Sequence, residues 1–444
     1  MAHGGIKTYW IIGLSATLVL ALFLLFYPKN PLVSYYQPRI SQNLKDYIPA
    51  TLRAKRLVSI EQQRKNTSQF LAIYFAPWRL PLDTKVYTAS PLRHTQHNIQ
   101  KEWQSDIDAL AIDKVTYYGA NLQPYTQQAL ATIIQKARQY KPMSENAIVV
   151  QPTYLRLLPF SLPLYHSNKI AGQGYPFDDI QYSSLWIGQP VRIIGQTQDQ
   201  AWDFVVLSGQ IGWVKSLDMA RVSQQFEKQY IHSPFVAITH DDEVAQKRIG
   251  MILPVINHIV EMPARDPRST FAELVVAHVK KKDYVRFPIP MTGENMMMLM
   301  QQMIGEPYSW GGLNYYRDCS ATVQSLYAAF GLWLPRNSAV QTIARPKVDL
   351  SALADQDKII FIEKKAKPLM TLLSMPGHIT IYLGRQHGRL YVLHDSWGMK
   401  TEDMLGHLGR AVIGKVVVSS QDLGHGVPYV HRTLLSLITA MTNL

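Results

Sequence analysis

Cysteine is almost absent from this chain: Cys319 is the only one in 444 residues. A single cysteine excludes an intrachain disulfide and any zinc site built from several cysteines. The HExxH spacing of zinc peptidases is also missing, so we expect neither a metal nor another cofactor. Cys319 itself is either a small buried hydrophobe or a nucleophile.

Acidic residues are too few to balance the basic ones, and the formal net charge is +13. The basic residues are scattered, and their longest run, Lys280-Lys281-Lys282, is typical of a solvated loop or strand edge. No nucleic-acid-binding motif accompanies the charge. The excess therefore favours an anionic partner, such as anionic lipid or an acidic cell-wall polymer, over nucleic acid.

Long hydrophobic runs are scarce, with one exception near the N-terminus. The run Tyr9–Tyr27 contains no charged residue and approaches the ~20 residues needed to cross a bilayer core. Tyr9, Trp10 and Tyr27 stand at its ends, where aromatic rings favour the membrane interface. We expect residues 1–30 to form an uncleaved transmembrane signal anchor; the alternative is a cleaved signal peptide.

The rest of the chain is too long for one core and changes pattern along its length. Residues 31–150 are mixed and helix-leaning, whereas residues 151–225 and 226–290 contain short β runs separated by Gly, Asp and Pro. Such runs predict two small all-β barrels in tandem. Helical and strand patterns combine in residues 291–444, which predicts a multi-domain protein ending in an α+β domain.

Cys319 is predicted to lie at the start of a helix. Val323, Leu326 and Phe330 follow it at helical spacing, and Asp318 is a suitable N-cap. The positive end of the helix dipole and the free amide N–H groups stabilise a thiolate there, so we expect a lowered thiol pKa.

Two histidines are candidates for the base that such a nucleophile needs. His378 begins an alternating strand pattern and His394 ends the next one, with a turn near Gln386 between them. A hairpin centred on Gln386 would place the histidines opposite one another, with Cβ atoms roughly 5 Å apart. His394 could then orient His378 while His378 takes the proton of Cys319.

Five segments closely resemble motifs of the NlpC-type cell-wall cysteine peptidases: GEPYSWGG, RDCSA, FGLWLPRNSAVQ, PGHITIYLG and HDSWG. They occur in the family's order within residues 291–418. Upstream, YPFDDIQYSSLWIGQPVRIIG and GWVKSLDMA resemble a bacterial SH3-like domain, and FLAIYFAPW resembles the N-terminal stabilising segment of members with two such domains. The resemblance implies a stabilising segment at 31–150, SH3-like domains at 151–225 and 226–290, and a papain-like catalytic domain at 291–444.

The family implies hydrolysis of the bond between γ-D-glutamate and the diamino acid of peptidoglycan stem peptides, through a thioester. Carried over by motif, Cys319 is the nucleophile, His378 the general base and His394 the orienting residue. Tyr308 would lie beside the thiol and assist the oxyanion site. No cofactor is implied.

The substrate-binding residues are also implied by the resemblance. Residues matching Asp318 and Ser320 bind the free amino terminus of L-alanine in multi-domain relatives, and Trp310, Gly311 and Arg317 complete the set. An SH3-like domain closing one end of the groove would restrict the enzyme to stem peptides already released from the glycan. With the anchor, this implies a cell-envelope enzyme on the outer face of the cytoplasmic membrane.

Small departures from the family motifs leave the catalytic groups in place: Ala321 and Ser309 stand where many members have glycine. One alternative is a non-catalytic protein that binds wall peptides. Another keeps the triad for amidase or acyl-transfer chemistry, which the same residues can perform.

Overall fold

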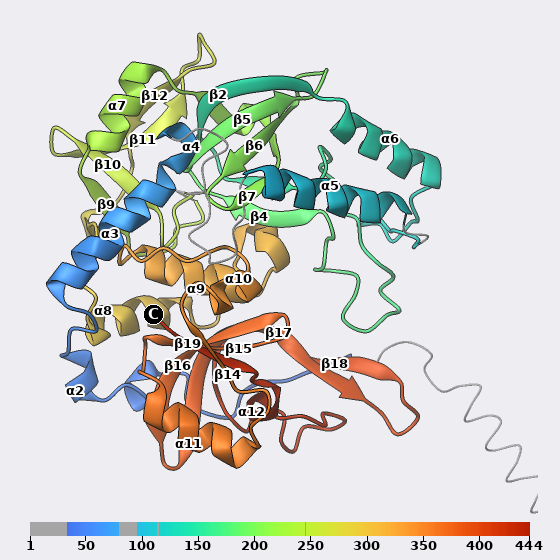
Figure 1. The fold of residues 1–444 in the computed structure, drawn as a ribbon, viewed down its shortest axis with the longest axis vertical. Coiled ribbons are helices and arrows are strands. Elements are labelled where there is room, and N and C mark those ends of the chain that lie inside the picture. The colour runs from blue at the N-terminus through green and yellow to red at the C-terminus, as the bar shows by residue number, and fades with distance from the viewer. Residues whose placement is uncertain (1–32, 80–95, 113–114, 245) are drawn as a thin grey trace, which may run out of the picture.

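The computed structural model describes residues 33–79, 96–112, 115–244 and 246–444 (Figure 1). The predicted anchor Tyr9–Tyr27 lies outside these residues. Within them, no helix combines the length and the apolar character that a membrane span requires.

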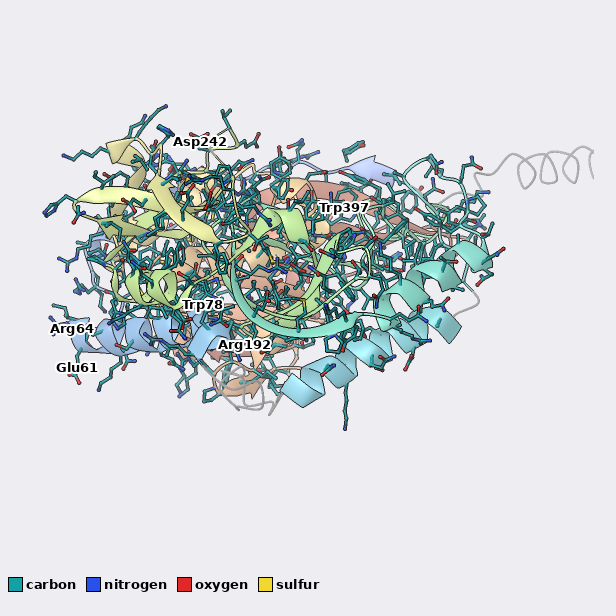
Figure 2. All side chains as sticks on the ribbon, turned by 90° about the horizontal axis from the view of Figure 1, so that it is seen from above. Glu61, Arg64, Trp78, Arg192, Asp242 and Trp397 are labelled. Carbon is teal, nitrogen blue, oxygen red and sulfur yellow. The ribbon has the colours of Figure 1, made fainter. Side chains whose placement is uncertain are left out.

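Helices dominate the N-terminal part of the described chain. Ser59 and Thr126 cap α3 and α6 by accepting hydrogen bonds from Gln62 N–H and Ala129 N–H. The buried Trp78 donates its indole N–H to the carbonyl of Ala147 at 2.8 Å, which ties these helices to the first β domain (Figure 2). The helices are α2 (Ala50–Arg53), α3 (Ile60–Tyr74), α4 (Ala76–Arg79), α5 (Gln96–Ile112) and α6 (Gln127–Arg138).

The first β domain is a seven-stranded sheet of order β4-β3-β7-β6-β5-β2-β8. All its strand pairs are antiparallel, and alternate residues of β4 are buried. The sheet begins ten residues before the predicted boundary at 151, because β2 pairs with both β5 and β8. Its strands are β2 (Lys141–Val149), β3 (Thr153–Arg156), β4 (Gln181–Leu185), β5 (Pro190–Gln196), β6 (Trp202–Leu207), β7 (Gln210–Lys215) and β8 (Met219–Arg221).

The second β domain follows α7 (Gln224–His232) and is a five-stranded antiparallel sheet of order β12-β11-β10-β9-β13. A separate apolar cluster fills it, with Ile238 and Leu253 fully buried. Its strands are β9 (Phe235–Ile238), β10 (Ile252–Ile256), β11 (Ile259–Arg265), β12 (Ala272–Val276) and β13 (Tyr284–Arg286).

The C-terminal domain is built on a seven-stranded sheet of order β1-β18-β17-β16-β15-β19-β14. Helices α8, α9 and α10 lie on one side of it, and α11 and α12 on the other (Figure 1). Its strands are β1 (Val33–Tyr35), β14 (Lys347–Asp349), β15 (Thr371–Met375), β16 (His378–Gln386), β17 (Arg389–Glu402), β18 (Leu408–Ser420) and β19 (Ala440–Asn443). Its helices are α8 (Gly293–Met303), α9 (Cys319–Ala328), α10 (Ser338–Thr342), α11 (Asp355–Lys365) and α12 (Leu434–Leu437).

Both ends of the described chain enter this sheet. β1 is an edge strand and pairs in parallel with β18, whereas the sequence pattern predicts that residues 31–150 form a separate segment. At the other end, β19 pairs between β14 and β15. The C-terminal tail, which no motif explained, is therefore an interior strand of the catalytic sheet.

One hydrophobic core joins the domains. It contains Phe75 from the N-terminal helices, Ile148 and Phe235 from the two β domains, and Met300 and Leu326 from α8 and α9. The methionines of α8 that recur at helical spacing are part of this core and are buried. The domains are thus packed as one body around the start of α9 (Figure 1).

Candidate active site

Cys319 is the first residue of α9, as predicted. The Asp318 side chain caps the helix by accepting the backbone N–H of Ala321 at 2.9 Å. The thiol is 7% exposed, and its sulfur accepts a hydrogen bond from the backbone N–H of Ile379. That contact places the thiol beside the start of β16, where His378 stands.

The expected lowering of the thiol pKa is wrong. Burial raises the pKa of Cys319 to about 12, and the negative charges of Asp318 and Asp395 add to the shift. Burial also lowers the pKa of His378 to about 4, which Asp318 only partly opposes. Desolvation and neighbouring carboxylates therefore outweigh the helix dipole, and the resting pair is a neutral thiol and a neutral imidazole.

The two predicted histidines are in contact. His378 Nε2 lies 2.8 Å from His394 Nδ1, and His394 Nε2 lies 2.9 Å from Ser419 Oγ on β18. Protons on both Nε2 atoms satisfy both contacts and leave a lone pair on Nδ1 of His378. No hydrogen bond joins Cys319 to His378 among the described contacts, so proton transfer requires the two groups to approach further.

The geometry of this histidine contact differs from the one expected. Ile381 pairs with Leu393, and a bulge interrupts the ladder between Tyr382 and Gly384. The hairpin turns at His387-Gly388, because Gln386 pairs with Arg389, and is not centred on Gln386 as expected. The bulge offsets one residue of this difference, and His378 lies two residues beyond the position opposite His394. The rings meet diagonally, with centroids 5.0 Å apart.

A turn with unusual backbone angles precedes the nucleophile. Gly311 and Gly312 have φ of 59° and 77°, which favours glycine. Gln181 on β4 donates its side-chain N–H to the Gly311 carbonyl at 2.9 Å. A Cβ atom on Gly311 would lie only 2.7 Å from the Gln181 carbonyl oxygen. The first β domain therefore packs directly on the turn that leads to Cys319.

Tyr308 and Trp310 precede this turn in the chain, and both line the cavity that contains Cys319. Burial, and then the charge of Asp318, raise the pKa of Tyr308 far above its ordinary value, so its hydroxyl stays protonated and can donate a hydrogen bond. Trp310 is 39% exposed. Its ring packs against Phe177, which also contacts Trp397 on β17. Trp397 is labelled in Figure 2.

Asp318 is bonded more extensively than a simple helix cap. Its Oδ1 accepts hydrogen bonds from Ser320 Oγ and Arg336 Nη1, and its Oδ2 accepts from Gly311 N–H and Arg336 Nη2. The Asp318–Arg336 ion pair is close to fully buried and lowers the pKa of Asp318, against its burial. The role predicted for Asp318 and Ser320 in binding an amino terminus stays a prediction, and it requires a substrate ammonium to share this carboxylate with Arg336.

Arg317 does not reach the site predicted for it. Its guanidinium is 4% exposed and forms ion pairs with Asp241 at 2.6 Å and Glu306 at 2.5 Å. It also donates to the carbonyl of Ile249. These contacts point it into the junction with the second β domain, because the carboxylates of Asp241 and Glu306 hold its buried charge there.

The thiol opens into a cavity of about 750 Å³. One wall is the catalytic domain, with Cys319 and Arg336. The other is formed by the first β domain and α5, including Tyr182, Glu102 and Asp106. Tyr182 donates its hydroxyl proton to Asp106 at 2.5 Å, which joins α5 to the sheet at this wall.

Several residues of the site carried no sequence signal that assigned them a role. Arg336 lies within the segment FGLWLPRNSAVQ. The only indication that it has a role is that a basic residue stands in an otherwise mostly apolar segment. Ser419 is one hydroxyl at the end of a valine run, and Ser183, whose Oγ accepts Arg336 Nε–H at 2.9 Å, lies in another domain. Within the described ranges, no group of three or more His, Cys, Asp or Glu side chains could hold a metal ion.

Three family models match the chain. The NlpC/P60 family matches residues 305–410, the N-terminal NLPC_P60 stabilising domain matches 18–140, and an SH3 domain of the SH3b1 type matches 163–215. The SH3 match covers part of the first β domain. That the second β domain is also SH3-like remains a prediction.

Known proteins resemble the chain in sequence and in fold. The "Bifunctional muramidase/DL-endopeptidase CwlT" of Bacillus subtilis is 28% identical over 140 residues, which is 30% of this chain and 40% of that protein. The chain thus spans less than half of that relative. A solved structure described as a novel NlpC/P60 endopeptidase from Photobacterium damselae subsp. piscicida has a TM-score of 0.84 and 24% identity, covering 93% of this chain and 99% of its own. The chain therefore carries a papain-like NlpC/P60 domain preceded by the family's stabilising domain and an SH3 domain.

Proposed function

We propose that this protein is a cysteine endopeptidase that hydrolyses the γ-D-glutamyl–diamino acid bond of peptidoglycan stem peptides. One observation carries the proposal: the buried thiol of Cys319 adjoins the strand that begins with His378, His378 contacts His394, and the thiol opens into a cavity. The DL-endopeptidase named among the similar proteins supports the substrate class.

The reaction follows from the neutral resting pair. Nδ1 of His378 takes the proton of Cys319 as sulfur attacks the γ-carbonyl carbon of D-glutamate. The Tyr308 hydroxyl and the Cys319 backbone N–H donate to the oxyanion. The C–N bond then breaks, and His378 returns the proton to the leaving amine. Water, deprotonated by His378, hydrolyses the thioester and regenerates the thiol.

His394 and Ser419 are positioning residues in this scheme. Their chain of hydrogen bonds fixes the ring of His378 and favours the tautomer that accepts a proton at Nδ1. The raised thiol pKa is consistent with general-base catalysis, because the proton leaves Cys319 only as the new bond forms.

The walls of the cavity favour released stem peptides over intact wall. α5 and the first β domain border the space beside Arg336, and a glycan strand attached to the peptide is much bulkier than a free amino terminus. We also propose that the Tyr9–Tyr27 run anchors the enzyme at the outer face of the cytoplasmic membrane. This localisation rests on the apolar character of that run.

The test uses the full-length protein and its Cys319→Ala variant. Each is incubated with L-Ala-γ-D-Glu-diaminopimelate and separately with intact sacculi, and products are identified by mass spectrometry. We expect release of the L-Ala-D-Glu dipeptide from the tripeptide by the parent alone. Cleavage of sacculi as well would contradict the restriction to released peptides.

Two results would favour the alternatives. Binding of the tripeptide without any product would support a non-catalytic wall-binding protein. Products of transfer to an added amine, in place of hydrolysis, would support an acyltransferase on the same triad.

A further inference from the structure

The hairpin of β17 and β18 projects from the body of the catalytic domain (Figure 1). Its turn exposes three large apolar side chains: Met404 is 95% exposed, Leu405 53% and Leu408 41%. The adjacent edge strand β1 adds Val33 at 64% and Tyr35 at 86% exposure. We call these five residues the tip patch.

The turn that carries Met404 and Leu405 is held in a defined shape. The buried Asp403 accepts the backbone N–H groups of Leu405 and His407 at its Oδ1, each at 2.9 Å. The Asp403 N–H donates to the His407 carbonyl at 3.0 Å, and Gly406, with φ of 81°, closes the turn. The apolar side chains are therefore presented outward by a bonded scaffold, and their exposure is a feature of the fold.

The pairing of β1 shows where the preceding chain leads. Val33 pairs in parallel with Arg410, two residues after β18 begins at Leu408. Because the strands are parallel, the chain enters β1 from the side of the hairpin tip. Tyr27, the end of the apolar run, precedes Val33 by six residues, which reach at most about 20 Å.

We propose that the tip patch contacts the surface of a lipid bilayer and orients the catalytic domain on it. If Tyr9–Tyr27 spans the membrane, the short connection holds the tip patch against that surface, with exposed methionine, leucine and tyrosine side chains toward the acyl boundary. Lys400, next to the patch on β17, has a side chain 58% exposed and lies 3.6 Å from the Glu402 carboxylate, an exposed pair weak enough to leave the ammonium accessible to anionic headgroups. This inference rests on the membrane attachment proposed above and is independent of the peptidase chemistry.

The experiment exploits the single native cysteine. In a Cys319→Ala background of the full-length protein, Leu405→Cys carries an environment-sensitive fluorophore. The matched control is Leu217→Cys on the first β domain, where Leu217 is 76% exposed. Both proteins are reconstituted into phosphatidylethanolamine–phosphatidylglycerol vesicles, with and without a spin-labelled quencher lipid, and flotation reports their attachment.

We expect both proteins to float with the vesicles, and the label at position 405 to be quenched at least twofold more than the label at 217. Flotation with equal quenching at both positions would overturn the tip contact while leaving the anchor intact. Failure to float would overturn the anchor and the tip contact together. A spectral shift at 405 that grows with protein concentration without lipid would overturn the proposal in favour of self-association. None of these outcomes bears on the peptidase, which is tested separately with the tripeptide.

Discussion

The first and second β domains both pack against the segment that precedes Cys319, but through different chemistry. The first reaches the Gly311 turn and Arg336 through the side chains of Gln181 and Ser183, and it lines the cavity. The second supplies Asp241 and Arg248 to an ion-pair cluster with Arg317 and Glu306. Among the described residues, none from the second domain lines the cavity around the thiol.

The two domains therefore have different roles: the first positions groups at the candidate active site, and the second stabilises the fold. Hydrogen bonds to a turn with positive φ angles fix where the nucleophile and its neighbours lie, so the first β domain is part of the active site. The ion-pair cluster of Arg317 does not line the cavity, although Arg317 directly precedes Asp318, which does. The cluster holds two domains together, and its loss is expected to lower the stability of the fold.

Arg317→Met is predicted to cause the largest loss of stability. The side chains of Glu306, 8% exposed, and Asp241, 24% exposed, would keep only Arg248 among the described residues as a cationic partner. Breaking a buried ion pair costs about 3–5 kcal/mol, and we expect about 3 kcal/mol here because Arg248 remains. Urea denaturation measures the change. Lys65→Met, which removes an exposed ion pair with Glu61, is the control and should change little. A large fall in kcat with unchanged stability would instead support the prediction that Arg317 binds substrate.

The pH dependence of stability distinguishes the catalytic pair from this cluster. The folded-state pKa of His378, about 4, is below the ordinary value of 6.5, so between these values the unfolded chain binds a proton that the folded chain rejects. The stabilisation is complete above pH 6.5 and is lost as the pH falls toward 4, by about 3 kcal/mol. His378→Gln should remove this part of the pH dependence.

Arg317→Met should differ, because Arg317 is the largest influence that lowers the pKa of Asp241 against its burial. Without Arg317 that pKa rises, the folded chain binds a proton more readily, and stability should fall less than in the parent as the pH is lowered. Denaturation at a series of pH values checks both variants. Identical slopes for the parent and His378→Gln would contradict burial of a neutral His378.

Gln181→Leu tests whether the first β domain positions the turn. The substitution removes the hydrogen bond to the Gly311 carbonyl, and we expect kcat/KM to fall about tenfold, or about 1.4 kcal/mol. Gln189→Leu is the matched control, because Gln189 accepts the backbone N–H of Trp186 at 2.8 Å in the same domain and makes no contact with the turn. Equal losses of kcat/KM in both variants would show that the effect comes from general destabilisation of the domain and not from the turn.

Ser183→Ala should have the smallest effect. It removes one hydrogen bond to Arg336, which keeps its ion pair with Asp318, so a loss of about threefold in kcat/KM is expected. Steady-state kinetics with the tripeptide measures it. A loss as large as that of Gln181→Leu would show that Arg336, more than the glycine turn, depends on the first β domain.

Local sequence patterns predicted the parts of the site that lie within one element. The start of α9 at Cys319 followed from helical spacing, and the strands that carry His378 and His394 followed from alternation. The diagonal contact was missed because the turn is formed by His387-Gly388, both with positive φ, and is not centred on Gln386. The thiol pKa was misjudged because burial raises it most, followed by the charges of the adjacent Asp318 and of Asp395, which is distant in sequence.

Contacts between domains could not be predicted from local sequence patterns. The bond of Gln181 to Gly311 joins residues 130 apart, and that of Arg336 to Ser183 joins residues 153 apart. The strands at the ends, β1 and β19, are three and four residues long, too short for periodicity to reveal them. Their places in the catalytic sheet depend on the tertiary fold.

The most direct test of the central claim is the intact mass of the full-length protein, acid-quenched during turnover of L-Ala-γ-D-Glu-diaminopimelate. The account predicts a transient adduct of the L-Ala-γ-D-Glu acyl group on the peptide containing Cys319, and none in Cys319→Ala. Release of the dipeptide by Cys319→Ala would contradict the account, because another group would then perform the attack.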